Sequence, residues 1–87
     1  MNKLLISQII SRQKFDLSTY IKIKNNTDIT PEHAKHHLAV LQHFAKKELQ
    51  IAMSFHYMDN KNNDFTQFVK DCNKHLFKVY AETSKLD

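Results

Sequence analysis

Residues 49–70, LQIAMSFHYMDNKNNDFTQFVK, are compatible with two kinds of structure, a β-hairpin and a helix. The fold of the whole chain depends on which of the two forms. Large apolar side chains alternate with smaller or polar ones over residues 49–57, as they do in a half-buried strand. Residues 59–64 would then form a turn and residues 65–70 the returning strand of a hairpin. Alanine, methionine and glutamine are poor strand formers, so a helix through the same residues remains the alternative.

Glu48, just before this stretch, favours the hairpin. An unbroken helix from residue 30 to residue 58 would be long for a chain of 87 residues. At about 100° per residue it would also place Glu48 about 20° from Leu41, on the apolar face. A carboxylate buried there is costly unless it is paired. We therefore predict that the helix ends at residues 46–48 and that a hairpin follows.

Residues 29–44, ITPEHAKHHLAVLQHF, predict the helix that precedes the hairpin. Thr30 can cap this helix through its hydroxyl, and Pro31 suits the first helical position, where its missing N–H has no cost. One face of the helix is apolar and consists of Ala34, Leu38 and Leu41, widened by Val40 and Phe44. The opposite face is cationic to neutral, so the helix either packs in a bundle or enters a nucleic-acid groove.

Two further helices are predicted near the ends of the chain. Residues 2–13 have an apolar side, and residues 65–83 show a helical spacing of apolar side chains that is clear from Asp71 onward. A junction is predicted at residues 14–16. The segment after it fits a short helix or a strand and ends in a polar turn, where Ile29 is placed to fill the gap between two helices.

The composition indicates a single domain over residues 1–87. Cys72 is the only cysteine, which rules out an internal disulfide and suggests a reducing compartment. The absence of glycine argues against the phosphate-binding loops of nucleotide-dependent enzymes. No signal peptide, membrane-spanning segment, paired carboxylates or catalytic triad is visible, so we expect a cytoplasmic protein that is not an enzyme, uses no cofactor and does not bind a membrane.

The net charge of +4 is unevenly distributed. Residues 1–48 contain eight Lys/Arg and four Asp/Glu, whereas residues 49–87 contain five of each. The excess positive charge therefore lies in the N-terminal half. A polyanionic partner would account for it, and so would an ordinary solvated surface rich in lysine.

The predicted order of elements resembles a winged helix-turn-helix. Residues 29–41 look like the turn and recognition helix of small winged-helix transcription regulators, including those of fimbrial operons. In that family the turn residue is aliphatic, the cap is Ser or Thr, and the core positions are small or aliphatic, as they are here. The resemblance covers residues 17–58. It implies a mainly α fold with a recognition helix at residues 30–46, a short β-hairpin wing and a C-terminal helix.

The same resemblance implies a small DNA-binding regulator whose partner is double-stranded DNA. Lys35 would reach a phosphate or a guanine edge, His36 would donate to a base, and Ala39 would allow close approach. Thr30 and the helix N-terminus would lie against a phosphate. The full set of predicted DNA-binding residues is Thr30, Glu32, Lys35, His36, Ala39, His43, Lys46, Lys47 and Lys61. The alternative for each is a solvated surface side chain.

The histidines raise the question of a metal site. His33 and His37 are four residues apart and face the same side of the helix, a spacing that zinc ligands often have. No cysteine or carboxylate nearby in the sequence completes the set, so we predict no metal and a partly buried His37. Cys72 lies within an apolar stripe and is expected to be a core residue.

The alternative to the winged helix is an all-α small helical bundle. Such a chain would be a protein–protein interaction module, for example an adaptor, chaperone or inhibitor, without DNA binding. We also predict a homodimer formed through the C-terminal helix, because its apolar surface exceeds what one side of so small a core can cover. The alternative is that the helix at residues 2–13 covers this apolar surface and that Phe77 lies exposed. The predicted interface residues are Phe65, Phe68, Leu76, Phe77, Val79 and Tyr80.

Overall fold

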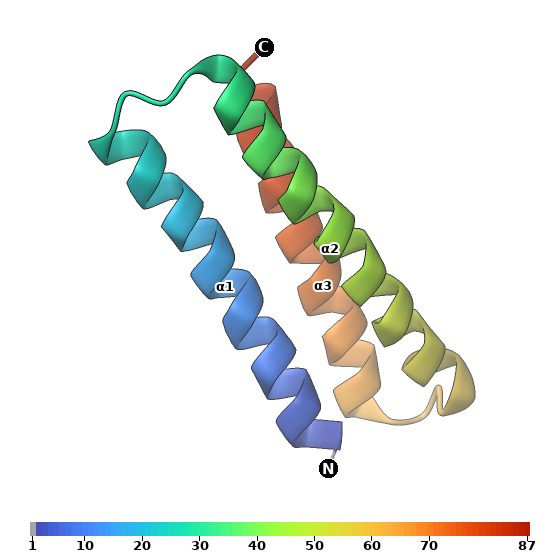
Figure 1. The fold of residues 1–87 in the computed structure, drawn as a ribbon. Helices are drawn as coiled ribbons and strands as arrows, with labels where there is room; N and C mark the ends of the chain where they lie inside the picture. The colour runs from blue at the N-terminus through green and yellow to red at the C-terminus, as the bar shows by residue number, and fades with distance from the viewer. Residues whose placement is uncertain (1) are drawn as a thin grey trace.

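The computed structural model describes the backbone of residues 2–87 and the side chains of residues 3–87. It contains three helices, α1 (Asn2–Asn26), α2 (Pro31–Met58) and α3 (Asn63–Ser84), and no strand between residues 2 and 87. Successive helices run in opposite directions, so α1 and α3 point the same way (Figure 1). The bundle is elongated, with extents of 46, 22 and 14 Å.

The predicted β-hairpin is wrong, and the winged helix-turn-helix fold is wrong with it. Residues 49–58 continue α2, and residues 63–70 begin α3. The buried residues of α2 keep a spacing of three or four through this region, since Leu41, Ala45, Glu48 and Ala52 all face the core. The alternation over residues 49–57 is a coincidence of composition on a helix, and the all-α bundle fits the structure.

Glu48 does not end the helix, because two side chains of α1 bind its carboxylate. Arg12 Nη2 donates to Glu48 Oε2 at 2.6 Å, and Gln13 Nε2 donates to Glu48 Oε1 at 3.3 Å. The Glu48 side chain is 8% exposed and that of Arg12 is 62% exposed. The pairing offsets the cost of burying the carboxylate, so an unbroken α2 is tolerated.

The boundaries of α2 and α3 follow the capping residues. Thr30 accepts a hydrogen bond from His33 N at 3.2 Å, and Pro31 is the first helical residue, as predicted. Residues 59–62 form the connection within the predicted turn. Asn62 Oδ1 accepts a hydrogen bond from Asp64 N at 2.9 Å, so Asn62 caps α3, which begins at the next residue. These side chains satisfy backbone N–H groups that a helix start leaves without partners.

The predicted junction at residues 14–16 is also wrong, because α1 runs through it without a break. Gln13, Leu17 and Tyr20 are all buried, at spacings of four and three, so the core-facing side of α1 is continuous. Ile29, in the connection to α2, packs half-buried against the cluster that contains Leu17 and Tyr20, as predicted.

The core has two apolar clusters separated by a polar layer. The cluster nearer the α1–α2 connection contains Leu17, Tyr20, Ala34, Leu38, Leu41 and Val79. The cluster nearer the α2–α3 connection contains Ile9, Ala52, Phe68 and Cys72. Each helix carries a buried polar residue between the two clusters, and these three residues (Gln13, Glu48 and His75) form what we call the polar layer.

The three helices do not pack equally. α2 and α3 contact each other along their length, whereas α1 makes fewer contacts with either of them. Hollows in the surface lie along both flanks of α1, and another lies where α2 and α3 meet. None of the three helices, over the residues described, has an apolar stretch long enough to cross a membrane.

Candidate functional site

Two of the predicted DNA-binding residues, Thr30 and Lys61, lie at opposite ends of α2. Thr30 caps its N-terminus, and Lys61 lies in the connection after its C-terminus. The 28 residues of α2, at about 1.5 Å each, separate them by about 40 Å. The structure therefore does not bring Thr30 and Lys61 together in one site.

The other predicted DNA-binding residues are exposed along α2, and several contact other side chains. Lys35 Nζ lies 3.7 Å from Asp87 Oδ1. Lys46 Nζ lies 5.9 Å from the centroid of the Tyr80 ring. The exposed set on α2 is Glu32, Lys35, His36, Ala39, His43, Lys46 and Lys47. Two of its three lysines thus have intramolecular partners, although both remain accessible.

The predicted dimer residues divide between the core and the surface. Phe65, Phe68 and Val79 are buried inside the bundle. Phe68 and Val79 belong to the two core clusters, and Phe65 stacks on Phe55 of α2. Leu76 is half-buried. Phe77 and Tyr80 are exposed, at 71% and 36%. Of the six predicted interface residues, Phe77 and Tyr80 are therefore the two that are well exposed to another molecule.

The two histidines considered as metal ligands lie apart from any ligand cluster. His33 is exposed, and His37 is half-buried with its ring edge-on to Tyr20, at a centroid distance of 5.2 Å. No group of three His, Cys, Asp or Glu side chains within the described residues could hold a metal ion. Cys72 is a buried member of the core, as predicted.

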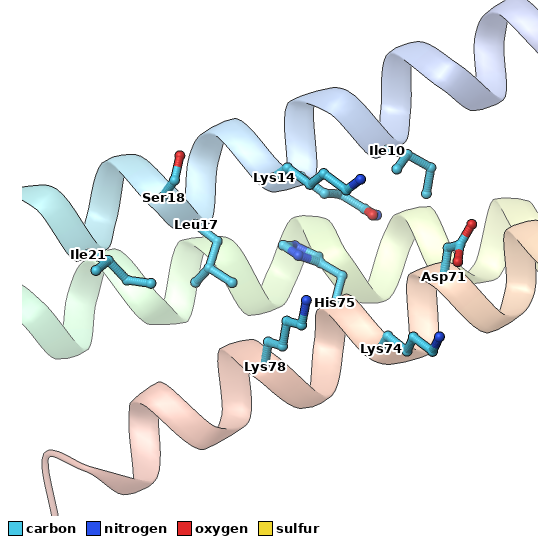
Figure 2. Close-up of a pocket in the computed structure, with 10 residues that line it drawn as sticks. Ile10, Lys14, Leu17, Ser18, Ile21, Asp71, Lys74, His75 and Lys78 are labelled. Atoms are coloured by element: carbon cyan, nitrogen blue, oxygen red, sulfur yellow. The ribbon is translucent and has the colours of Figure 1, made fainter.

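A groove of about 360 Å³ lies between α1 and α3, and we call it the α1–α3 groove (Figure 2). Helix α1 contributes Ile10, Gln13, Lys14, Leu17, Ser18 and Ile21, and α3 contributes Asp71, Lys74, His75 and Lys78. The apolar side chains come from α1, whereas the charged ones come mostly from α3. The groove exists because α1 packs loosely on this side of the bundle.

The charge of the α1–α3 groove is mainly positive. Lys14, Lys74 and Lys78 line it and are exposed, and none of the three forms an ion pair with residues 3–87. Asp71 is the one acid in the lining, and its Oδ1 already accepts a hydrogen bond from Gln67 at 2.9 Å. The groove therefore combines an apolar wall with three lysines that are available to an anion.

His75 joins the groove to the polar layer. Its side chain projects from α3 toward α1 (Figure 2) and is 8% exposed. Burial lowers the pKa of His75 below its usual value, because the charged imidazolium is poorly solvated there. The negative charges of Glu48 and Asp16 act in the opposite direction on this pKa, and Lys78 adds to the lowering.

Ser18, His75 and Asp71 all line the groove, but they do not form a hydrogen-bonded nucleophilic triad. Ser18 Oγ donates to the Phe15 carbonyl at 3.0 Å, and the Asp71 carboxylate is bound by Gln67. A nucleophile needs a base within hydrogen-bond reach, and that base needs an orienting partner.

A second, shallower hollow of about 700 Å³ lies on the opposite side of α3, where α2 and α3 meet. Met53 and Tyr57 of α2 line it together with Val69 and Asn73 of α3. Phe77 and Tyr80 continue the same side of α3 at helical spacing from Asn73. We call this surface, made of Met53, Tyr57, Val69, Asn73, Phe77 and Tyr80, the outer face. Its most exposed side chains are Tyr57 at 88% and Phe77 at 71%.

The groove lysines are not among the site residues predicted from the sequence. A signal was present, because Lys70, Lys74 and Lys78 recur every four residues and so share one side of a helix. This spacing of lysines does not appear in the net charge of residues 49–87, which is zero. The position of Lys14 across the groove depends on how α1 packs, which a local pattern does not reveal.

Comparison with known protein families, with curated protein sequences and with solved structures found no match to this chain. Its function is therefore inferred from its own residues.

Proposed function

We propose that the chain is a helical protein-interaction module, not an enzyme, and that it acts as a homodimer joined through the outer face. The observation that supports this proposal is the exposure of large apolar side chains at helical spacing on α2 and α3. Met53 and Tyr57 line the hollow and are 54% and 88% exposed. Phe77 is 71% exposed and lies one helical turn beyond Asn73, which also lines the hollow. A contiguous apolar surface of this kind is typical of interaction sites.

The size of the outer face is sufficient for a weak dimer. Its three aromatic side chains and Met53 expose on the order of 500 Å² together, given about 150–250 Å² for a whole aromatic residue. A standard interface buries about 800 Å² per partner, so these residues would supply most of it. We expect a dissociation constant of about 10–100 μM, because part of the gain offsets the entropy of association.

The charge of this surface favours a second copy of the same chain as the partner. None of the residues that line the hollow is an Asp, Glu, Lys or Arg. Placing two such hollows face to face about a two-fold axis brings no charged lining residues together, and Lys46, beside Tyr80, would lie at the edge of the contact. In such a dimer Tyr57, which lines the hollow and is 88% exposed, would enter the hollow of the other copy.

Sedimentation equilibrium between about 10 and 300 μM tests the dimer directly. We expect a monomer–dimer equilibrium that Tyr57→Ser or Phe77→Ser weakens at least about tenfold, as is usual for central aromatic residues of an interface. Phe15→Ser is the matched control, because Phe15 is 68% exposed but belongs to α1 and lies outside the outer face. All these residues are exposed, so the helix content should stay unchanged.

A monomer at every concentration would refute the dimer. A dimer that is insensitive to Tyr57→Ser and Phe77→Ser but lost with Phe15→Ser would place the interface on α1 instead. DNA binding by the exposed α2 residues stays a prediction. It has less support than the interaction module, because the hairpin wing is absent from residues 2–87 and Thr30 and Lys61 lie far apart.

A further inference from the structure

We infer that the α1–α3 groove is a docking site for an acidic amphipathic helix of a different protein. This inference concerns a surface separate from the outer face, so it holds or fails independently of the proposed dimer. It rests on three features of the groove: its apolar wall, its unpaired lysines and its orientation along two helices that run the same way (Figure 1).

The apolar wall is formed by one side of α1. Ile10, Leu17 and Ile21 line the groove at helical spacing, and Ile10 and Ile21 remain half-buried where α3 does not cover them. Apolar area left in contact with water is worth about 25 cal/mol per Å² when a partner covers it. A ligand for this groove therefore needs an apolar side of its own.

The lysines give the groove its selectivity for charge. Lys74 and Lys78 are one helical turn apart, about 6 Å along α3, and Lys14 lies on α1 across the groove (Figure 2). Carboxylates at positions i and i+4 of a docked helix have the same spacing. Glutamate or aspartate on both flanks of an apolar stripe would thus meet lysines on both sides of the groove.

Two other occupants fit less well. A second copy of this chain does not supply an acidic helix, because α1 and α2 carry more Lys and Arg than Asp and Glu, and α3 carries three of each. Nucleic acid would satisfy the lysines, but its phosphates offer nothing apolar to cover the half-buried Ile10 and Ile21. An acidic helix satisfies both parts of the groove and would complete a four-helix arrangement with α1, α2 and α3.

The test uses two fluorescein-labelled designed peptides of about 20 residues, long enough to form a helix on binding. Both carry leucine at the apolar positions of a helical stripe, and their flanks carry glutamate in one peptide and lysine in the other. Fluorescence anisotropy with the whole chain should show micromolar binding of the acidic peptide. The basic peptide should bind at least about tenfold more weakly, because it repels Lys74 and Lys78.

Variants locate the site. Lys74→Glu combined with Lys78→Glu should weaken acidic-peptide binding at least about tenfold, whereas Lys22→Glu combined with Lys47→Glu should change it less than about twofold. The control pair makes the same change in net charge with exposed lysines that do not line the groove. Ser18→Trp, at an exposed position in the groove lining, should block binding by filling the groove without altering the charge.

Three results with the peptides would overturn the inference: no binding of the acidic peptide, equal loss with the control pair, or undiminished binding to Ser18→Trp. A duplex oligonucleotide is titrated in parallel. If it binds more tightly than the acidic peptide and depends on Lys74 and Lys78, the lysines serve phosphates and the helix proposal is refuted. The dimer is measured separately with the Tyr57 and Phe77 variants. A result that refutes docking in the α1–α3 groove therefore does not refute the dimer, and the reverse also holds.

Discussion

The ion pair between Arg12 and Glu48 predicts an unequal response to removing its two members. Arg12→Met leaves a carboxylate that is 8% exposed and whose one remaining donor among residues 3–87 is the neutral Gln13 amide. Removing one partner of a fully buried pair costs about 3–5 kcal/mol, and a hydrogen bond to a charged group contributes about 1.5–3 kcal/mol. Because the Arg12 side chain is 62% exposed and partly screened, we expect the lower range, about 2 kcal/mol.

Glu48→Gln should cost less than about 1 kcal/mol of unfolding free energy. The amide oxygen can still accept from Arg12 or Gln13, and a neutral group is less costly to bury than a carboxylate. In the Arg12→Met background the same substitution should increase stability, because it removes the charge that has lost its partner. The sign of the Glu48→Gln effect therefore reverses between the two backgrounds.

Urea unfolding followed by circular dichroism measures these free energies. In a domain of this size, about 2 kcal/mol corresponds to a fall of roughly 8–16 °C in the melting temperature. The reasoning is refuted if Arg12→Met leaves stability unchanged, or if Glu48→Gln destabilises the chain equally in both backgrounds. Either result would mean that the buried carboxylate is tolerated without Arg12.

Two further predictions concern buried polar groups. Burial lowers the pKa of His75 in the folded chain. Below about pH 6.5 the unfolded chain therefore binds a proton at His75 more readily than the folded chain does. The unfolding free energy should fall as the pH drops from there through the lowered folded-state pKa. Urea unfolding at a series of pH values should show that His75→Gln flattens this part of the profile, and an unchanged profile would contradict the assignment. The Tyr20 hydroxyl is buried without a hydrogen-bond partner among the described residues, so Tyr20→Phe should raise the unfolding free energy by about 1 kcal/mol. A loss of stability in the same urea assay would show that the hydroxyl is bound, and Tyr57→Phe is the exposed control.

Local patterns in the sequence predicted those parts of the fold that depend on neighbouring residues. The cap at Thr30, Pro31 at the start of α2 and the half-buried Ile29 follow from residues within one or two turns of each other. The error at Glu48 has a different origin. The side chains that make its burial tolerable, Arg12 and Gln13, are 36 and 35 residues away and meet it only after α1 has packed.

The candidate site shows the same division between local and long-range information. The four-residue spacing of Lys74 and Lys78 is visible in the sequence. Their relation to Lys14 and to the apolar side of α1 depends on the packing of two helices that are not adjacent in the chain. A helical spacing identifies which residues share a face, but only the bundle determines which face another helix leaves uncovered.

The polar layer also determines where α1 can lie along the other two helices. Ile9, Gln13 and Leu17 follow one another at four-residue intervals on the buried side of α1, so a slide of one turn, about 5.4 Å, would exchange their places. With three apolar residues at these positions, neighbouring registers would be close in energy. In the actual sequence, the same slide would move Gln13 into an apolar cluster. It would also place Ile9 or Leu17 against the Glu48 carboxylate. We therefore expect a chain with leucine at positions 13 and 48 to stay helical while α1 samples more than one register.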